Sequence, residues 1–312
     1  MLWRLVGRRL IQLLISLFAV ITLTFFLMKA IPGNPFLQEQ AIPQEILDAM
    51  MHHYGFDKPI FVQYLTYLKK VVTFSLGPSF KFEGWSVNQI IYDGFPISLC
   101  LGVCALSLSI TFGILLGTLS ALYRGKWQDH FFMVLAVLGI STPSFILATL
   151  LQYLFAMKLS ILPIARWGGI SHLVLPVISL SALPTAFIAR LVKTNMIETL
   201  EQDYITMAKA KGLSTIKIVW HHVLKNSILP VLSYIGHISA SIMTGSFVIE
   251  KIFGIPGLGS WFVGSIINRD YTVIMGITVF YSSFLMLCIF IVDILYMLID
   301  PRINRSVKSL HG

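Results

Sequence analysis

Long apolar stretches separated by short polar segments dominate the pattern of residues along this chain. A helix needs roughly 20 residues to cross a bilayer, and six stretches approach that length: about 10–28, 97–122, 131–157, 173–190, 228–249 and 273–298. The fourth of them is short and contains Pro176 and Pro184. The pattern therefore predicts an all-α membrane protein with six transmembrane helices.

Composition and charge support this prediction and suggest an orientation. Hydrophobic residues make up 56% of the chain, charged residues 12%, and the mean hydropathy is +0.81, far from a soluble average. The net charge of +9 is interpreted as topology, since no soluble basic domain for nucleic acid is visible. Placing both termini in the cytoplasm puts 14 Lys and Arg in cytoplasmic segments and five in the short segments opposite. We therefore expect cytoplasmic termini.

The long segment 31–95 is expected to be extracytoplasmic and partly helical. Residues 43–56 and 59–72 each begin with a proline and carry helical patterns. The adjacent His52 and His53 point about 100° apart on a helix, which favours a solvated face over a metal site. No metal site is expected, and the cysteines, all inside apolar stretches, are interpreted as small buried hydrophobes.

A basic segment between the fourth and fifth stretches predicts two short helices joined by a turn. Asp203 is the expected N-cap of the first helix, and Gly212 the left-handed residue that ends it. Ser214 would cap the second helix, whose predicted apolar stripe is Ile216, Val219, Trp220, Val223 and Leu224. From these residues alone, a lipid-surface anchor, a plain connector and a docking site for a cytoplasmic partner remain open.

Two further features concern the apolar stretches themselves. Gly113 and Gly117 form a G-x-x-x-G pattern that predicts close helix packing. A helix break is expected in "GISTPSF" (139–145), and its freed backbone groups need polar neighbours or a wet cavity. The candidate pathway-lining residues are Ser141, Thr142 and Ser144 in this break, together with His237. Packing alone would explain the break equally well, and His237 also fits a hydrogen-bonded packing role.

Other classes of protein lack their expected motifs. The chain has no G-x-x-x-x-G-K-[ST] phosphate loop, and "WHHVL" lacks the glutamate and the spacing of H-E-x-x-H. We therefore expect no catalytic residues and no enzyme activity. Ion-coupled transporters usually carry ionisable residues in mid-membrane, whereas here only His237 lies near a stretch's centre. A self-contained secondary transporter or channel is the alternative hypothesis.

Several motifs together resemble a known family. "AKAKGL" (208–213) followed by "HVLKN" (222–226) is similar to the "EAA" loop of ABC importer permeases, with Thr206, Met207 and Ala208 in the E-A-A positions. The loop's usual I-x-L-P ending is displaced, since His222 begins those positions and Leu229-Pro230 comes later. The dipeptide, oligopeptide and nickel branch shows similar stretches elsewhere: "RRLIQLL" (8–14), "IPGNP" (31–35), "YGFDKPIFVQYLTYL" (54–68), part of "SLGPS" (75–79), "EKIFGIPGLG" (250–259) and "DILYMLIDPRIN" (293–304).

This resemblance implies one membrane subunit of a binding-protein-dependent importer, most simply for peptides. Its partners would be a homologous permease, two cytoplasmic ATPase subunits that hold ATP and Mg, and an extracytoplasmic substrate-binding protein; this chain would bind no cofactor. The first helix and outer segment would occupy 1–95, the permease domain 96–304 with a coupling loop at 194–227, and a cytoplasmic tail 305–312. The implied coupling residues are Thr206, Ala208, Lys209, Lys211, Gly212, Leu213 and His222.

Overall fold

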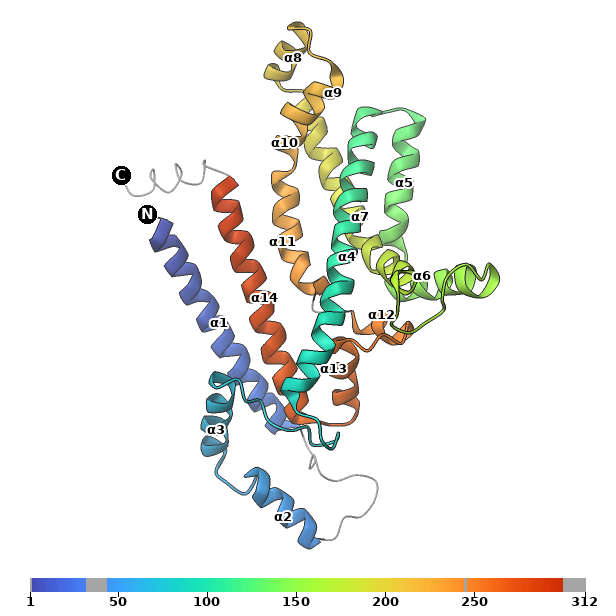
Figure 1. Cartoon of the computed structure of the whole chain (residues 1–312). Coiled ribbons are helices and arrows are strands. Elements are labelled where there is room, and N and C mark those ends of the chain that lie inside the picture. The colour runs from blue at the N-terminus through green and yellow to red at the C-terminus, as the bar shows by residue number, and fades with distance from the viewer. Residues whose placement is uncertain (1, 32–43, 244–245, 300–312) are drawn as a thin grey trace. The chain divides into compact units, whose positions relative to one another are not determined.

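The computed structural model (Figure 1) describes residues 2–31, 44–243 and 246–299 of the 312-residue chain. Within these ranges the protein is nearly all helical, and its one β-bridge joins Pro78 and Ser86. The chain divides into two compact units, one of residues 1–98 and 256–287, the other of residues 99–255 and 288–312. Helices α4 (Val87–Leu122) and α14 (Tyr271–Ile299) contribute to both units.

The first unit contains the two helices predicted in the outer segment. Pro59 is the N-cap of the second of them, as its fixed φ and missing N–H favour. A hydrophobic cluster of Ile21, Phe25, Tyr67 and Val279 joins three helices of this unit. Besides its parts of α4 and α14, the unit comprises α1 (Leu2–Ala30), α2 (Gln44–Tyr54), α3 (Ile60–Val72) and α13 (Leu258–Ile267). The helical form predicted for these two segments is thus confirmed, whereas most of "IPGNP" lies outside the described residues.

A buried carboxylate holds the "SLGPS" stretch in place within the first unit. Asp270 is fully buried just before α14, and it accepts hydrogen bonds from the hydroxyls of Ser79 and Thr272. The backbone N–H groups of Phe80 and Val273 also donate to it. Since hydrogen bonds to a buried charge offset its desolvation, Asp270 both begins α14 and fixes the loop of the outer segment against it.

The second unit packs α5 and α7 closely, with the glycines of α4 against α7. A Cβ added at Gly113 would lie 2.6 Å from the Cβ of Ile188, and one at Gly117 would lie 2.5 Å from the carbonyl oxygen of Ala189. The close packing predicted for the G-x-x-x-G pattern is therefore confirmed. The unit's further elements are α5 (Trp127–Ser141), α6 (Ser144–Leu151), the π-helix η1 (Gln152–Lys158), α7 (Ile170–Leu200), α8 (Asp203–Ala210), α9 (Thr215–Ile218), the π-helix η2 (Val219–Val223), α10 (Leu224–Ser227), α11 (Leu229–Met243) and α12 (Phe247–Ile252).

Within the described residues, five segments are long and apolar enough to cross a membrane: Val6–Ala30, Val87–Leu122, Ile170–Leu200, Pro230–Ile252 and Tyr271–Ile294. Two begin or end well outside the predicted ranges. Helix α4 begins before residue 97, and α7 continues past residue 190 to Leu200. Hydropathy misses these extensions because helical hydrogen bonding continues after the side chains become polar.

The predicted span 131–157 is a bent pair of helices. Helices α5 and α6 meet at 105° across Thr142 and Pro143. Proline disfavours a helical conformation in the residue before it, and Thr142 is accordingly extended, with φ −111° and ψ 120°. The break expected in "GISTPSF" is therefore present, and the part of the chain that the structure describes has up to six candidate spans if the bent pair counts as one.

Candidate coupling element

Two short helices and their turn project beyond the end of α7 (Figure 1), and we call residues 203–227, from α8 to α10, the coupling element. Two side-chain contacts hold this element in place, one within it and one to α7. Asn226 donates to the hydroxyl of Tyr204 at 2.9 Å, and the hydroxyls of Thr199 and Ser227 lie 3.3 Å apart. The element is thus fastened both across its own helices and to α7.

Gly212 forms the turn between α8 and α9. Its φ is +78°, in the left-handed region where a Cβ is disfavoured. The N–H of Gly212 donates to the carbonyl of Lys209 at 2.9 Å, and the N–H of Leu213 donates to that of Ala208 at 3.3 Å. These two bonds are those of the Schellman motif, which satisfies the last carbonyls of a helix. The predicted left-handed helix end at Gly212 is confirmed.

The inner face of the coupling element belongs to the hydrophobic core of the second unit. From this element Ile205, Ala208 and Ile218 are buried, as are Val219 and Val223. They form one cluster with Ile188, Val192, Met196 and Val231 from α7 and α11. The element and these two helices therefore share one close-packed core.

Two details of the predicted helices are wrong. The N-cap of α8 is Gln202 rather than Asp203, which instead opens the helix, where its charge suits the helix dipole. The π-helix η2 also shifts the apolar stripe, since Ile218 is buried whereas Ile216 and Trp220 are 73% and 65% exposed. A π-helical turn holds one residue more than the regular spacing assumes, so positions before and after it turn onto different faces.

The outer face of the element combines apolar and basic side chains. Tyr204, Met207, Ile216 and Trp220 are exposed there, and so are Lys209, Lys211 and Lys217. Exposed apolar groups beside charged ones are typical of protein–protein contact surfaces. The element therefore has a buried inner face and an exposed outer face of apolar and basic side chains.

The predicted coupling residues fall on both faces. Thr206, Lys209, Lys211 and Gly212 are exposed and are available for contact. Ala208 is buried, and Leu213 and His222 are partly buried, with Leu213 packed against the core cluster. Leu213 and Ala208 therefore shape the element from inside, and the role of each residue in coupling stays a prediction.

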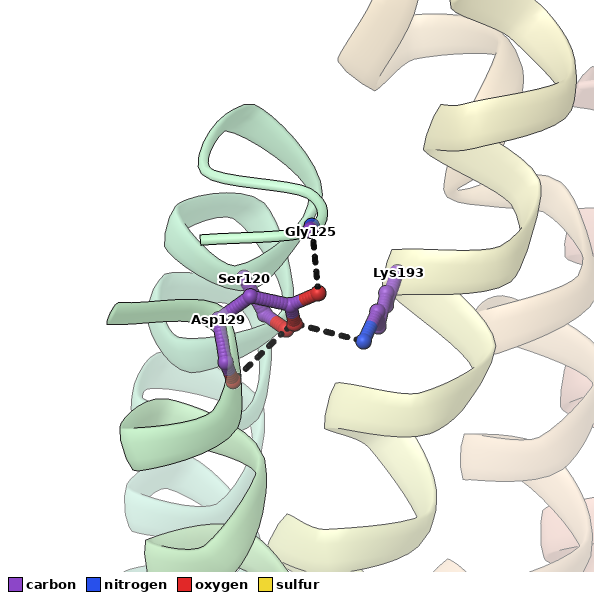
Figure 2. A network of polar contacts seen from close by, with 4 residues as sticks. All are labelled: Ser120, Gly125, Asp129 and Lys193. Carbon is purple, nitrogen blue, oxygen red and sulfur yellow. Dashed lines mark hydrogen bonds and ion pairs between the residues drawn. The ribbon is translucent and has the colours of Figure 1, made fainter. Parts of the chain in front are cut away.

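A buried polar network, which the sequence reasoning missed, lies in the same unit (Figure 2). The carboxylate of Asp129, at the start of α5, accepts bonds from Lys193 of α7 at 2.5 Å and from the buried hydroxyl of Ser120. The N–H of Gly125 donates to its other oxygen at 3.2 Å. Only 5% of Asp129 is exposed, so these donors replace the water that a buried carboxylate loses.

An exposed ion pair parallels this network nearer the coupling element. Arg124 and Glu201 lie 2.5 Å apart, with both side chains more than half exposed. The segment between α4 and α5 is thereby linked to α7 twice, once by the buried Asp129–Lys193 pair and once by the exposed Arg124–Glu201 pair just before α8. The sequence does contain one signal for the buried network. Asp129 is an acidic residue at the edge of an apolar stretch, and such a residue is expected to have a partner.

The predicted pathway residues remain untested. The hydroxyl of Ser141 is exposed and donates to the carbonyl of Val137 in its own helix at 3.3 Å. Thr142 and Ser144 are partly exposed on either side of Pro143. The side chain of His237 lies outside the described part of the structure. In the described ranges, no three His, Cys, Asp or Glu residues are grouped as metal ligands.

Comparison with known proteins identifies the family. Residues 113–305 match the family described as "Binding-protein-dependent transport system inner membrane component", and residues 1–102 match its N-terminal counterpart. The chain belongs to this family. The resemblance inferred from the "EAA"-like loop and the outer motifs is confirmed.

Relatives match over nearly the whole chain. The dipeptide transport system permease protein DppB of Bacillus subtilis (strain 168) is 49% identical over 94% of this chain and 96% of its own length. The oligopeptide transport system permease protein OppB of Haemophilus influenzae is 40% identical over 95% of this chain and 98% of its own length.

Solved structures agree at the level of the fold. A chain of the inward-facing MetNI methionine ABC transporter superposes with a TM-score of 0.58 at 16% identity, covering 68% of this chain and 97% of that one. An amino acid ABC transporter crystallised with histidines gives a TM-score of 0.53 at 15% identity, covering 67% and 93%. At such identities the likeness concerns the fold alone.

Proposed function

We propose that this chain is the permease subunit of an ATP-driven, binding-protein-dependent importer for short peptides, and that it forms half of the translocation pathway. Its family is that of transport-system membrane components. The relatives matched along almost its full length are named for dipeptide and oligopeptide transport. A peptide cargo is therefore the most economical assignment, with selection between peptides left to the external binding protein.

The observation that carries the mechanism is the two-faced coupling element. Its inner face shares a core with α7 and α11, and its outer face presents Lys209, Lys211 and Trp220. A partner that binds the outer face and moves will rotate or shift those helices, since packed cores are not continuously deformable. The partners are two cytoplasmic ATPase subunits, which hold ATP and Mg, while this chain holds no cofactor.

The rest of the assembly follows from the same assignment. The bent pair of α5 with α6 counts as one of six spans, and both termini and the coupling element face the cytoplasm, as the Lys and Arg distribution favours. A homologous second permease completes the pathway. The extracytoplasmic binding protein delivers peptide to the opposite face, and Ser141, Thr142, Ser144 and His237 are proposed to line the route.

The test is reconstitution of the assembled transporter into vesicles with a labelled dipeptide. Uptake should require ATP, the binding protein and the ATPase subunits, and the purified chain alone should neither hydrolyse ATP nor concentrate peptide. Concentrative uptake by the isolated chain on a proton or sodium gradient would contradict the proposal and establish a secondary transporter.

A further inference from the structure

The first unit contains a half-open basic cavity that the transport assignment does not use, with the side chains of Lys58 and Lys70 exposed at it. It measures about 260 Å³ and lies among α1, α3, the loop after α3 and the start of α14. Lys29, Lys58 and Lys70 line it together with His53, and its described lining contains no Asp or Glu. Among the described residues, none of the three lysines forms an ion pair. Three positive charges thus line a cavity whose described lining residues carry no negative charge.

Two buried hydroxyls in the same lining have no hydrogen-bond partner among the described residues. Tyr67 is 9% exposed and Tyr271 is 6% exposed, and neither phenol oxygen finds a donor or acceptor in the described structure. Buried polar groups are normally satisfied. Burial beside Tyr64 raises the pKa of the Tyr67 phenol above its ordinary value, so this hydroxyl stays protonated and able to donate.

The charged groups at and beside the cavity have other contacts. The ammonium nitrogen of Lys29 sits 4.1 Å from the centre of the Phe56 ring, a cation–π contact that fixes it without neutralising it. The carboxylate of Asp270 is occupied by Ser79, Thr272 and backbone N–H groups. The unsatisfied chemistry of this cavity is therefore that of an oxyanion site with ammonium and hydroxyl donors.

An apolar cavity adjoins the basic one. It measures about 430 Å³, shares Met28 and Tyr271 with the first, and is lined by side chains such as Leu27, Phe262 and Ile274. Elsewhere in this unit, Phe61 on α3 is 69% exposed and Phe74 after it is 82% exposed. A ligand suited to both cavities carries a negative headgroup on a hydrocarbon tail.

We propose that this pair of cavities binds an anionic phospholipid, with its phosphate among Lys29, Lys58, Lys70, Tyr67 and Tyr271 and an acyl chain in the apolar cavity. The bound lipid joins α1, α3 and α14, and so links the outer segment to the membrane. This inference requires membrane insertion and does not depend on the cargo or on ATP coupling.

The experiment uses the assembled transporter, purified in detergent and washed free of lipid. Phosphatidylglycerol or phosphatidylcholine with identical acyl chains is added back, and bound lipid is counted by native mass spectrometry. The triple variant Lys29→Gln, Lys58→Gln, Lys70→Gln should bind phosphatidylglycerol on the order of 100-fold more weakly, since each basic residue contributes about a fivefold effect. Lys69→Gln is the matched control, because Lys69 is exposed on the same helix outside the lining.

A second variant guards against loss of folding. Tyr271→Phe keeps the packed ring and removes the hydroxyl, and it should weaken phosphatidylglycerol binding by roughly tenfold without changing the melting temperature of the lipid-free complex. Equal binding of both lipids, or unchanged binding in the triple variant and in Tyr271→Phe, would overturn the proposal. Displacement of the lipid from the wild type by millimolar phosphate or dipeptide would overturn it too, by showing a site for free anions.

Discussion

The buried carboxylate of Asp129 depends on a few named donors, and its strongest partner is the ammonium group of Lys193. That pair joins residues 64 positions apart in the sequence and lies largely out of water, with the two side chains 8% and 24% exposed. Breaking one half of a buried pair leaves an uncompensated charge. The pair therefore holds the start of α5 to α7 more firmly than its single contact suggests.

Lys193→Met should accordingly lower the free energy of unfolding by about 3–5 kcal/mol, measured by denaturant titration of the purified protein in detergent. Adding Asp129→Asn to that variant should restore part of the loss, because the neutral amide costs less to bury. Arg124→Met is the comparison, since the exposed Arg124–Glu201 pair should contribute no more than about 1 kcal/mol. Equal losses from Lys193→Met and Arg124→Met would contradict the role given to the buried network.

At the scale of elements, we expect the binding of the ATPase subunits to depend on the apolar side chains that face outward from the coupling element. Trp220 is 65% exposed on the outer face, and exposed tryptophans are frequent hot spots of protein interfaces. Trp220→Ala should weaken binding of the ATPase subunits by at least about 2 kcal/mol, measured by titrating them onto the purified permease pair.

Trp127→Ala provides the matched control for this prediction. Trp127 is 72% exposed at the start of α5, in the same unit but outside the coupling element. Its replacement should leave the affinity for the ATPase subunits unchanged. A loss of affinity as large as that of Trp220→Ala would show that the outer face of the coupling element is not the specific contact surface.

Sequence patterns predicted these elements unevenly, for physical reasons. The helix–glycine–helix form of the coupling element was predictable because Gly212 follows a basic last turn, a local signal. The shift of the stripe at η2 was not, because the same residues fit an α- or a π-helical turn and packing decides between them. The Asp129–Lys193 pair escaped prediction for another reason: only the packing of α5 on α7 brings the two residues together.

At the scale of the whole molecule, the account requires a definite orientation in the membrane. Single cysteines at Glu83 and Ile267, both exposed, should react with an impermeant reagent from outside when the native Cys100, Cys104 and Cys288 are replaced. Cysteines at Lys126 and Lys217, equally exposed, should react only after the membrane is opened. Labelling of position 217 from outside in intact cells would reverse the orientation and remove the coupling element from the cytoplasm.

We propose that the turn at Gly212 transmits force between the ATPase subunits and the membrane helices. A Cβ at Gly212 meets no atom within 4 Å, so the obstacle to a side chain is the φ of +78°. A β-branched residue there costs about 1–2 kcal/mol, enough to re-aim α9 but too little to unfold the protein. Gly212→Asn, which tolerates this conformation better, and Gly84→Val, at an equally open φ of +78° in the outer segment, are the two controls.

The decisive measurement is ATP-driven dipeptide uptake in vesicles together with co-purification of the ATPase subunits, for Gly212→Val and its controls. We expect Gly212→Val to insert normally into the membrane and to lose most uptake, with the ATPase subunits detached or hydrolysing ATP without transport. Gly212→Asn and Gly84→Val should retain transport. Full uptake and normal co-purification in Gly212→Val would contradict the account and leave the element as a connector or a lipid anchor.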